Sequence, residues 1–257
     1  MKNAYVTGAS QGIGKEFVRA LSKDYNVFLI SRTESDLKKV ILELEPKSRG
    51  ILKYFALDLT KKKDVEELAE IIAKDKDAEL VVNNAGFGTV GEFATLPLDK
   101  ELDEVNLNVK TLVHLSHVAL GRFKKNKKGY LINVASIAGY LPAPGSAIYA
   151  ATKAFVKSFT ESIHEEAKPH GVYVQALCPG LTHSDFHQRA GINKSKYPSF
   201  MWQDASVVVE ESLDALRYNQ AVCITGSFNQ GAVTISELIP RGFLRKLSGK
   251  YLKLEED

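Results

Sequence analysis

Short apolar runs alternate with longer amphipathic segments along the chain. Runs rich in β-branched and aromatic residues predict strands at Asn3–Thr7, Asn26–Ile30, Leu52–Leu57, Leu80–Val82, Tyr130–Ile132, Val172–Leu177 and Val222–Thr225. Helical periodicity predicts helices after Gly14, from residue 34 to about 45, from Thr60, over Asp99–Arg122 and over Ile148–Ala167. This alternation predicts a single α/β domain, residues 1–257, built on a doubly wound parallel sheet of the Rossmann type.

Two regions depart from this regular pattern. Residues 181–220 are loosely patterned but rich in large side chains, namely Phe186, His187, Tyr197, Phe200, Met201 and Trp202. We interpret them as a substrate loop that could close as a lid, or alternatively as residues that simply pack. The tail, residues 240–257, is basic and amphipathic, although Gly242 and Gly249 weaken it as a helix. Packing on its own domain or on a neighbouring subunit is the favoured interpretation, and a membrane-surface role is the alternative.

Composition narrows the class of protein further. The chain has 257 residues and a net charge of +3, which is too small to argue for nucleic-acid binding. Cys178 and Cys223 lie in no metal or redox spacing, so neither a metal site nor a disulfide framework is predicted. The sequence opens directly on a strand and contains no apolar run long enough to span a membrane. We therefore expect a cytoplasmic protein.

A glycine-rich loop follows the first strand and opens the first helix. It reads Thr7-Gly8-Ala9-Ser10-Gln11-Gly12-Ile13-Gly14. In this context the first glycine allows a tight turn, the second allows the backbone to approach a pyrophosphate, and the third allows close helix packing. The amino end of the helix would then attract the phosphates of a dinucleotide. A plain glycine turn is the alternative.

The end of the second strand bears on the choice of cofactor. Enzymes that bind NAD usually place an acid here for the ribose hydroxyls, whereas a nearby arginine accommodates the 2′-phosphate of NADP. This chain has Ser31 and then Arg32. The pair favours NADP(H) over NAD(H), unless Arg32 is only a solvated loop residue.

Three residues after the fifth strand could perform acid–base chemistry. Ser136 follows that strand, and Tyr149 and Lys153 are neighbours on one face of the next predicted helix. A free tyrosine has a pKa of about 10, and a nearby ammonium group should lower it. With a serine hydroxyl to bind a carbonyl, the set could donate a proton to a ketone or accept one from an alcohol. Without a cofactor site, the tyrosine and lysine would be an ordinary helix pair.

Taken together, these residues resemble the short-chain dehydrogenase/reductase family, in its TGxxxGxG branch, over Asn3 to about Gly226. The resemblance implies a catalytic tetrad, Asn108, Ser136, Tyr149 and Lys153, in which Asn108 helps to hold a proton-relaying water. It implies cofactor contacts from Gly8, Ser10, Gln11, Gly12, Ile13, Gly14, Ser31, Arg32, Asp58, Leu59, Asn84, Ala85, Gly86, Tyr149, Lys153, Pro179, Gly180 and Thr182. Asp58 and Leu59 would flank the adenine, Asn84 would lie near its ribose, and Pro179 to Thr182 would contact the carboxamide. NADP enzymes of this branch often carry a basic residue where this chain has Gln11, so Arg32 must supply the phosphate preference largely alone.

The favoured function is an NADP-dependent oxidoreductase that acts on a hydrophobic ketone, aldehyde or secondary alcohol. The loop region and the tail resemble those of 17β-hydroxysteroid and long-chain 3-ketoacyl reductases. The alternatives are a non-catalytic NADP-binding sensor or scaffold on the same fold, and a membrane-associated interaction protein that uses its tail. The resemblance also implies a homodimer or homotetramer, paired through the helices that carry Asn108 and Tyr149.

Overall fold

One parallel sheet runs through the molecule. The computed structural model describes residues 1–184, 186 and 198–251. The sheet contains β1 (Asn3–Thr7), β2 (Asn26–Ser31), β3 (Leu52–Ala56), β4 (Ala78–Asn83), β5 (Gly129–Val134), β6 (Val172–Cys178) and β9 (Val222–Ile224), in the order β3-β2-β1-β4-β5-β6-β9. The predicted doubly wound α/β fold is thereby confirmed, and the predicted strands differ from these mainly at their ends.

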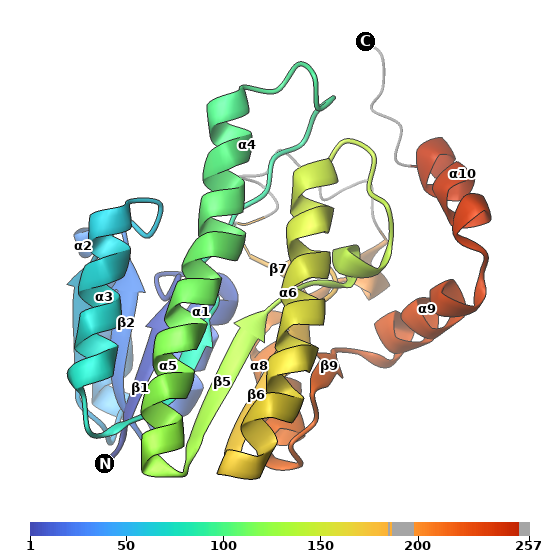
Figure 1. Ribbon diagram of the computed structural model, residues 1–257. Coiled ribbons are helices and arrows are strands. Elements are labelled where there is room, and N and C mark those ends of the chain that lie inside the picture. Colours follow the sequence, from blue (N-terminus) through green and yellow to red (C-terminus); the bar gives the residue numbers. More distant parts are fainter. Residues whose placement is uncertain (185, 187–197, 252–257) are drawn as a thin grey trace.

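Helices cover both faces of the sheet. They are α1 (Gly12–Leu21), α2 (Glu34–Leu44), α3 (Lys62–Lys74), α4 (Leu98–Val105), α5 (Leu112–Asn126), α6 (Ala147–Ala167), α8 (Ala205–Arg217), α9 (Ser227–Leu238) and α10 (Arg241–Tyr251). In Figure 1, α3, α5 and α6 cover the near face. One buried cluster joins the sheet to α1, α2 and α8, and a second joins it to α3, α5 and α6. Strands buried on both faces explain the continuous apolar runs of the sequence.

The order of the strands predicts at which edge of the sheet a ligand binds. The chain moves outward from β1 through β2 to β3, and then returns to pair β4 on the other side of β1. In open parallel sheets, ligands bind outside the carboxyl ends of the strands at such a reversal. The glycine loop after β1 and the segment after β4 therefore lie side by side at the expected site.

The helix predicted over Asp99–Arg122 is interrupted. α4 ends at Val105, a π-helical turn occupies Asn106–Thr111, and α5 begins at Leu112. A π-turn places one extra residue in the helical ladder and often marks a functional position. Here it contains Asn108, whose side chain is buried.

The end of the chain is more helical than its sequence indicates. Residues 205–217 of the loosely patterned region form α8, and the short strands β7 (Thr182–His183) and β8 (Gln203–Asp204) pair beside it. α9 was not expected at all. The tail forms α10 despite Gly242 and Gly249, because both glycines lie in the end turns, where fewer helical hydrogen bonds depend on them.

Nowhere in the part of the chain that the structure describes does a helix combine the length and the apolar character needed to cross a membrane.

Candidate active site

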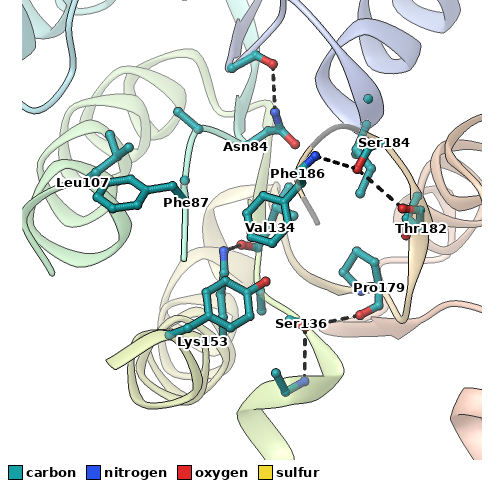
Figure 2. A pocket seen from close by; sticks show the side chains of 18 of the residues that line it. Asn84, Phe87, Leu107, Val134, Ser136, Lys153, Pro179, Thr182, Ser184 and Phe186 are labelled. Carbon is teal, nitrogen blue, oxygen red and sulfur yellow. Dashed lines mark hydrogen bonds between the residues drawn. The ribbon is translucent and has the colours of Figure 1, made fainter. Parts of the chain in front are cut away.

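The glycine loop after β1 is fixed by the segment after β4. Gly8 and Gly12 have φ values of +66° and +53°, a left-handed conformation that favours glycine. The Thr7 hydroxyl accepts hydrogen bonds of 2.9 Å from the backbone N–H groups of Asn84 and Ala85. The Asn84 amide in turn donates to the carbonyl oxygens of Thr7 and Gly8, at 2.9 and 3.2 Å. Asn84, which the resemblance places near a ribose, therefore holds the loop in shape (Figure 2).

A cavity of about 580 Å³ extends along this edge of the sheet. The predicted site residues on its wall are Gly8, Ser10, Gln11, Gly12, Ile13, Ser31, Arg32, Asp58, Leu59, Asn84, Ala85, Gly86, Ser136, Tyr149, Lys153, Pro179, Gly180 and Thr182. Gly14 and Asn108 stand behind the wall. A Cβ atom on Gly14 would collide with the carbonyl oxygen of Gly8, which confirms the close packing predicted for this glycine.

The far end of the cavity, beside β2, is polar. The Ser31 hydroxyl donates to that of Ser10 at 3.2 Å. Arg32 is exposed on the cavity wall, and no carboxylate of the described residues pairs with its guanidinium. Asp58 accepts hydrogen bonds from the backbone and hydroxyl of Thr60, at 3.1 and 2.8 Å. This end therefore offers the neutral Ser31 hydroxyl and the Arg32 guanidinium to a ligand, whereas the Asp58 carboxylate is already bound to Thr60.

Ser136 lies where β5 ends and a short 3₁₀ turn begins. Its hydroxyl accepts a 3.1 Å hydrogen bond from the N–H of Ala138 and donates to the carbonyl oxygen of Pro179 at 3.4 Å (Figure 2). Ser136 also lies near Tyr149 on the cavity wall, where its hydroxyl lowers the pKa of the phenol. The serine is thus held by its own 3₁₀ turn and by the segment after β6.

Tyr149 and Lys153 lie one turn apart on α6, as the sequence predicts, but their proton affinities differ from the expectation. Burial raises the pKa of Tyr149 to about 12, and the nearby Ser136 hydroxyl only partly opposes this rise. Burial also lowers the pKa of Lys153 to about 8. The lysine Nζ donates to the carbonyl oxygen of Val134 at 2.8 Å and lies 5.6 Å from the tyrosine ring centroid. The expected lowering of the tyrosine pKa by the ammonium group is not found, because desolvation dominates.

The Asn108 side chain binds the loop that follows β4. Its amide donates to the carbonyl oxygen of Phe87 at 2.9 Å, and its oxygen accepts from the N–H of Phe87 at 3.2 Å. A further bond of 3.2 Å reaches the hydroxyl of Thr152 on α6. A Cβ atom on Gly86 would lie 2.8 Å from the Asn108 oxygen and 3.6 Å from the Lys153 nitrogen. The structure thus brings Asn108 close to Lys153, with Gly86 between them.

A buried acid that was not predicted from the sequence lies beside Asn108 and Lys153. Glu104 on α4 is fully buried, and its carboxylate accepts hydrogen bonds from Thr89 in the same loop. Burial raises the pKa of Glu104 to about 7. The sequence does contain a signal, because Glu104 precedes Asn108 by four residues and so shares its helix face.

Apolar side chains line the other end of the cavity. The Phe186 ring lies 5.6 Å from the Tyr149 ring, and Leu141, Met201 and Val233 add to this wall. Met201 and Phe186 come from the region predicted as a substrate loop, whereas Val233 comes from α9. Of the other large side chains in that region, His187 and Tyr197 lie outside the described residues.

The residues present fit a nicotinamide dinucleotide. The left-handed Gly12 opens α1 and frees its first N–H groups for phosphate oxygens. The cavity joins this position to Arg32 at one end and to Tyr149 and Lys153 at the other. Within the described residues, no three His, Cys, Asp or Glu side chains are grouped to bind a metal ion.

Comparison with known proteins agrees with this fit. Residues 2–195 match the family model described as short chain dehydrogenase. The very-long-chain 3-oxoacyl-CoA reductase of Rattus norvegicus is 28% identical over 268 residues, which cover 97% of this chain and 82% of the relative. Two fungal reductases of the same description are each 33% identical, but this chain spans only about half of their length, 53% and 52%.

Solved structures are similar over nearly the whole chain. A short-chain dehydrogenase from Sphingobium yanoikuyae in complex with NADPH has a TM-score of 0.84 and 26% identity, covering 93% of this chain and 94% of its own. The bulky-bulky ketone specific alcohol dehydrogenase from Comamonas testosteroni has a TM-score of 0.80 and 25% identity, covering 96% and 94%.

Proposed function

The chain belongs to the short-chain dehydrogenase family, and we propose that it is an NADP(H)-dependent reductase of bulky, apolar ketones or aldehydes. As a member of this family it is an oxidoreductase that transfers a hydride between a nicotinamide cofactor and a C=O or CH–OH group. The observation that carries the proposal is the single cavity wall shared by Arg32, Ser136, Tyr149, Lys153 and the apolar end.

In the proposed reaction, the nicotinamide supplies the hydride and the protein supplies the proton. The Tyr149 hydroxyl protonates the developing alkoxide, and a phenol whose pKa burial raises to about 12 holds that proton until an oxyanion forms. The Ser136 hydroxyl binds the substrate oxygen. Lys153 holds the nicotinamide ribose and, with Asn108 behind it, returns a proton to Tyr149 after turnover. In the direction of alcohol oxidation, Tyr149 accepts the proton instead.

The proposed substrate is apolar because the wall beside Tyr149 is apolar. Leu141, Phe186, Met201 and Val233 offer few hydrogen bonds but a large contact area. Two of the relatives are named for a very-long-chain 3-oxoacyl-CoA and for bulky-bulky ketones, which is consistent with a wide apolar pocket. The test is NADPH consumption with a series of aryl ketones, 3-oxoacyl thioesters and small polar carbonyls. Reduction of small polar carbonyls alone would contradict an apolar pocket.

Cofactor preference is proposed from Ser31 and Arg32. An acid at Ser31 would repel the 2′-phosphate, whereas the planar guanidinium of Arg32 can bind it with a charge-assisted hydrogen bond. Such a bond contributes roughly 1.5–3 kcal/mol, or about ten- to a hundredfold in affinity. Arg32→Ala should weaken NADPH binding by about that factor and leave NADH nearly unchanged.

The matched variant is Ser31→Asp, which adds repulsion and an acceptor for the ribose hydroxyls of NADH. It should move the ratio of kcat/KM for the two cofactors further toward NADH than Arg32→Ala does. A wild type that already prefers NADH, or an Arg32→Ala variant that weakens both cofactors equally, would overturn the NADP assignment.

The alternative of a non-catalytic NADP-binding sensor predicts binding without turnover. All four tetrad residues are present, with Ser136, Tyr149 and Lys153 on the cavity wall, so the enzyme is the favoured interpretation. Tight NADPH binding with no reduction of any carbonyl in the series would favour the sensor.

A homodimer or homotetramer is proposed, paired through the surface of α4, α5 and α6. Leu98 and Leu102 on α4 and Phe155 on α6 are exposed by 62%, 51% and 42%, so they offer apolar surface that a second copy of the chain could bury. Phe155→Glu should therefore yield a monomer by sedimentation. Val207→Glu on α8 is the control, since Val207 is also 42% exposed. A monomeric wild type at micromolar concentration would contradict the proposal.

The basic tail is proposed to pack partly on its own domain. In α10, Leu244 is buried whereas Phe243 is 58% exposed beside Arg245 and Lys246. The alternative of a membrane-surface role is tested by flotation with anionic liposomes, with and without residues 241–257. A cytoplasmic location stays a prediction from the sequence, which cell fractionation would check.

A further inference from the structure

Glu104 is a buried acid with an incomplete set of hydrogen bonds. Its side chain is 0% exposed, although it belongs to a helix that is otherwise largely polar. Oε2 accepts a hydrogen bond from the backbone N–H of Thr89 at 3.1 Å and lies 3.2 Å from the Thr89 hydroxyl, whose single hydrogen it shares with Glu101. Oε1 is buried and has no partner among the described residues. A buried carboxyl with an unpaired oxygen is costly to keep, so its presence calls for a role beyond packing.

The loop that Glu104 holds touches the reacting side chains. A Cβ atom on Gly88 would lie 2.8 Å from the ring of Tyr149, and one on Gly86 would lie 3.6 Å from the Lys153 nitrogen. Asn108 binds both backbone groups of Phe87, and Glu104 binds the backbone N–H of Thr89 and shares its hydroxyl with Glu101. Two side chains one turn apart therefore fix residues 86–89 at neighbouring points, directly against the tyrosine and the lysine.

Glu104 also acts on these residues through its charge. On its own helix the facing titratable group is Glu101, which accepts a hydrogen bond from the Thr89 hydroxyl and whose charge disfavours ionisation of Glu104. On α6, the positive charge of Lys153 favours ionisation. In return, the Glu104 charge raises the pKa of Lys153 against the effect of burial, and it raises the pKa of Tyr149. The Cys178 thiol on β6 also faces Lys153, and burial raises its pKa to about 12.

We propose that Glu104 is a positioning residue of the active site: it holds Thr89 so that residues 86–89 stay against Tyr149 and Lys153. From this place its negative charge also favours the ammonium form of Lys153. The inference rests on the proposed roles of Tyr149 and Lys153. It adds to them an acid that stands behind the cavity and reaches the reaction only through its neighbours. Because this acid is close to half-ionised near neutral pH, the charge on Lys153 becomes sensitive to pH in that range.

The central test is a direct titration of Lys153, which needs neither cofactor nor substrate. Lysine side-chain nitrogens are followed by NMR from pH 6 to 11 in wild type, with the Lys153 signal assigned by its loss in Lys153→Met. Glu104→Gln keeps an acceptor oxygen for Thr89 but removes the charge, so Lys153 should lose its proton about 0.5–1 pH unit lower. Glu101→Gln removes a carboxylate on the same threonine that disfavours ionisation of Glu104, so in this variant Lys153 should keep its proton to the same or a slightly higher pH.

A second measurement separates charge from contact. Glu104→Leu removes the Thr89 bonds as well as the charge, so amide hydrogen exchange at residues 87–89 should accelerate at least tenfold over Glu104→Gln. NADPH affinity, read by nucleotide fluorescence, should begin to fall at lower pH in Glu104→Gln than in wild type. A purely structural glutamate would alter exchange in Glu104→Leu but would not move the Lys153 titration in Glu104→Gln.

An unchanged Lys153 titration in Glu104→Gln overturns the electrostatic role, and unchanged exchange in Glu104→Leu overturns the positioning role. Failure of the proposed function is seen separately, as a wild type that does not bind NADPH or reduce any carbonyl, and the NMR and exchange measurements remain decisive in that case.

Discussion

Two pairs of polar residues, each spaced by four positions on neighbouring helices, differ in what they face. Tyr149 and Lys153 on α6 point into the cavity and are both on its wall. Glu104 and Asn108, on α4 and the π-helical turn, point instead at the loop after β4 and bind its backbone. The first pair is placed to touch cofactor and substrate. The second is placed to fix the loop that lies against the first.

The difference shows how one spacing serves two purposes. A pair on a cavity wall needs groups that exchange protons or bind a ligand, so a phenol and an amine suit it. A pair behind a loop needs acceptors and donors for buried backbone groups, so an amide and a carboxylate suit it. The hydrogen bond between Asn108 and Thr152 joins the two helices and keeps the pairs in register.

The largest effect is expected from the pair on the cavity wall. Tyr149→Phe keeps the buried ring and removes the hydroxyl, so the proton can no longer be delivered to the substrate oxygen. We expect kcat to fall by about 10²- to 10⁴-fold while NADPH binding is retained. Stopped-flow reduction and nucleotide fluorescence measure the two quantities. Near-normal turnover would mean that another group donates the proton. Tyr149 and Lys153 would then no longer differ from Glu104 and Asn108 in touching the substrate.

A smaller effect, on stability as well as rate, is expected from the pair behind the loop. Asn108→Ala leaves the N–H and the carbonyl of Phe87 without their partner, at a cost of about 2–4 kcal/mol in the free energy of unfolding. Urea unfolding measures this loss. Asn126→Ala is the control, because Asn126 makes its hydrogen bonds at the far end of α5. If both variants lose the same stability, Asn108 is no more than an ordinary helix residue.

The sheet and the shared helix face of Tyr149 and Lys153 could be predicted from the sequence, whereas the contacts of Glu104 and Asn108 could not. Buried parallel strands give apolar runs such as Val172–Leu177, which are visible in the local sequence. The glycine loop is also visible locally, because its three glycines stand at a fixed spacing between a strand and a helix. Glu104 lies among the acids of a polar helix, and only the fold shows that it faces a loop distant in sequence. The π-turn at Asn106–Thr111 and the helices α9 and α10 depend likewise on tertiary packing, which outweighs local propensity.

The smallest effect is a pH dependence of stability between pH 5 and pH 7.5, which Glu104 of the second pair should produce. Burial raises the pKa of Glu104 from its ordinary value to about 7, so the folded state binds a proton more tightly than the unfolded chain does. The contribution of Glu104 to stability is therefore fully present below pH 4.5 and is lost as pH rises through about 7. Lys153, with its pKa lowered to about 8, adds a change of opposite sign mainly above that pH. Between pH 5 and pH 7.5, wild type should lose about 1–2 kcal/mol of unfolding free energy relative to Glu104→Gln. Urea unfolding of both proteins at the two pH values measures this difference. A stability difference between wild type and Glu104→Gln that stays unchanged over this interval would mean that Glu104 is ionised throughout in the folded state, and that its charge does not change near neutral pH.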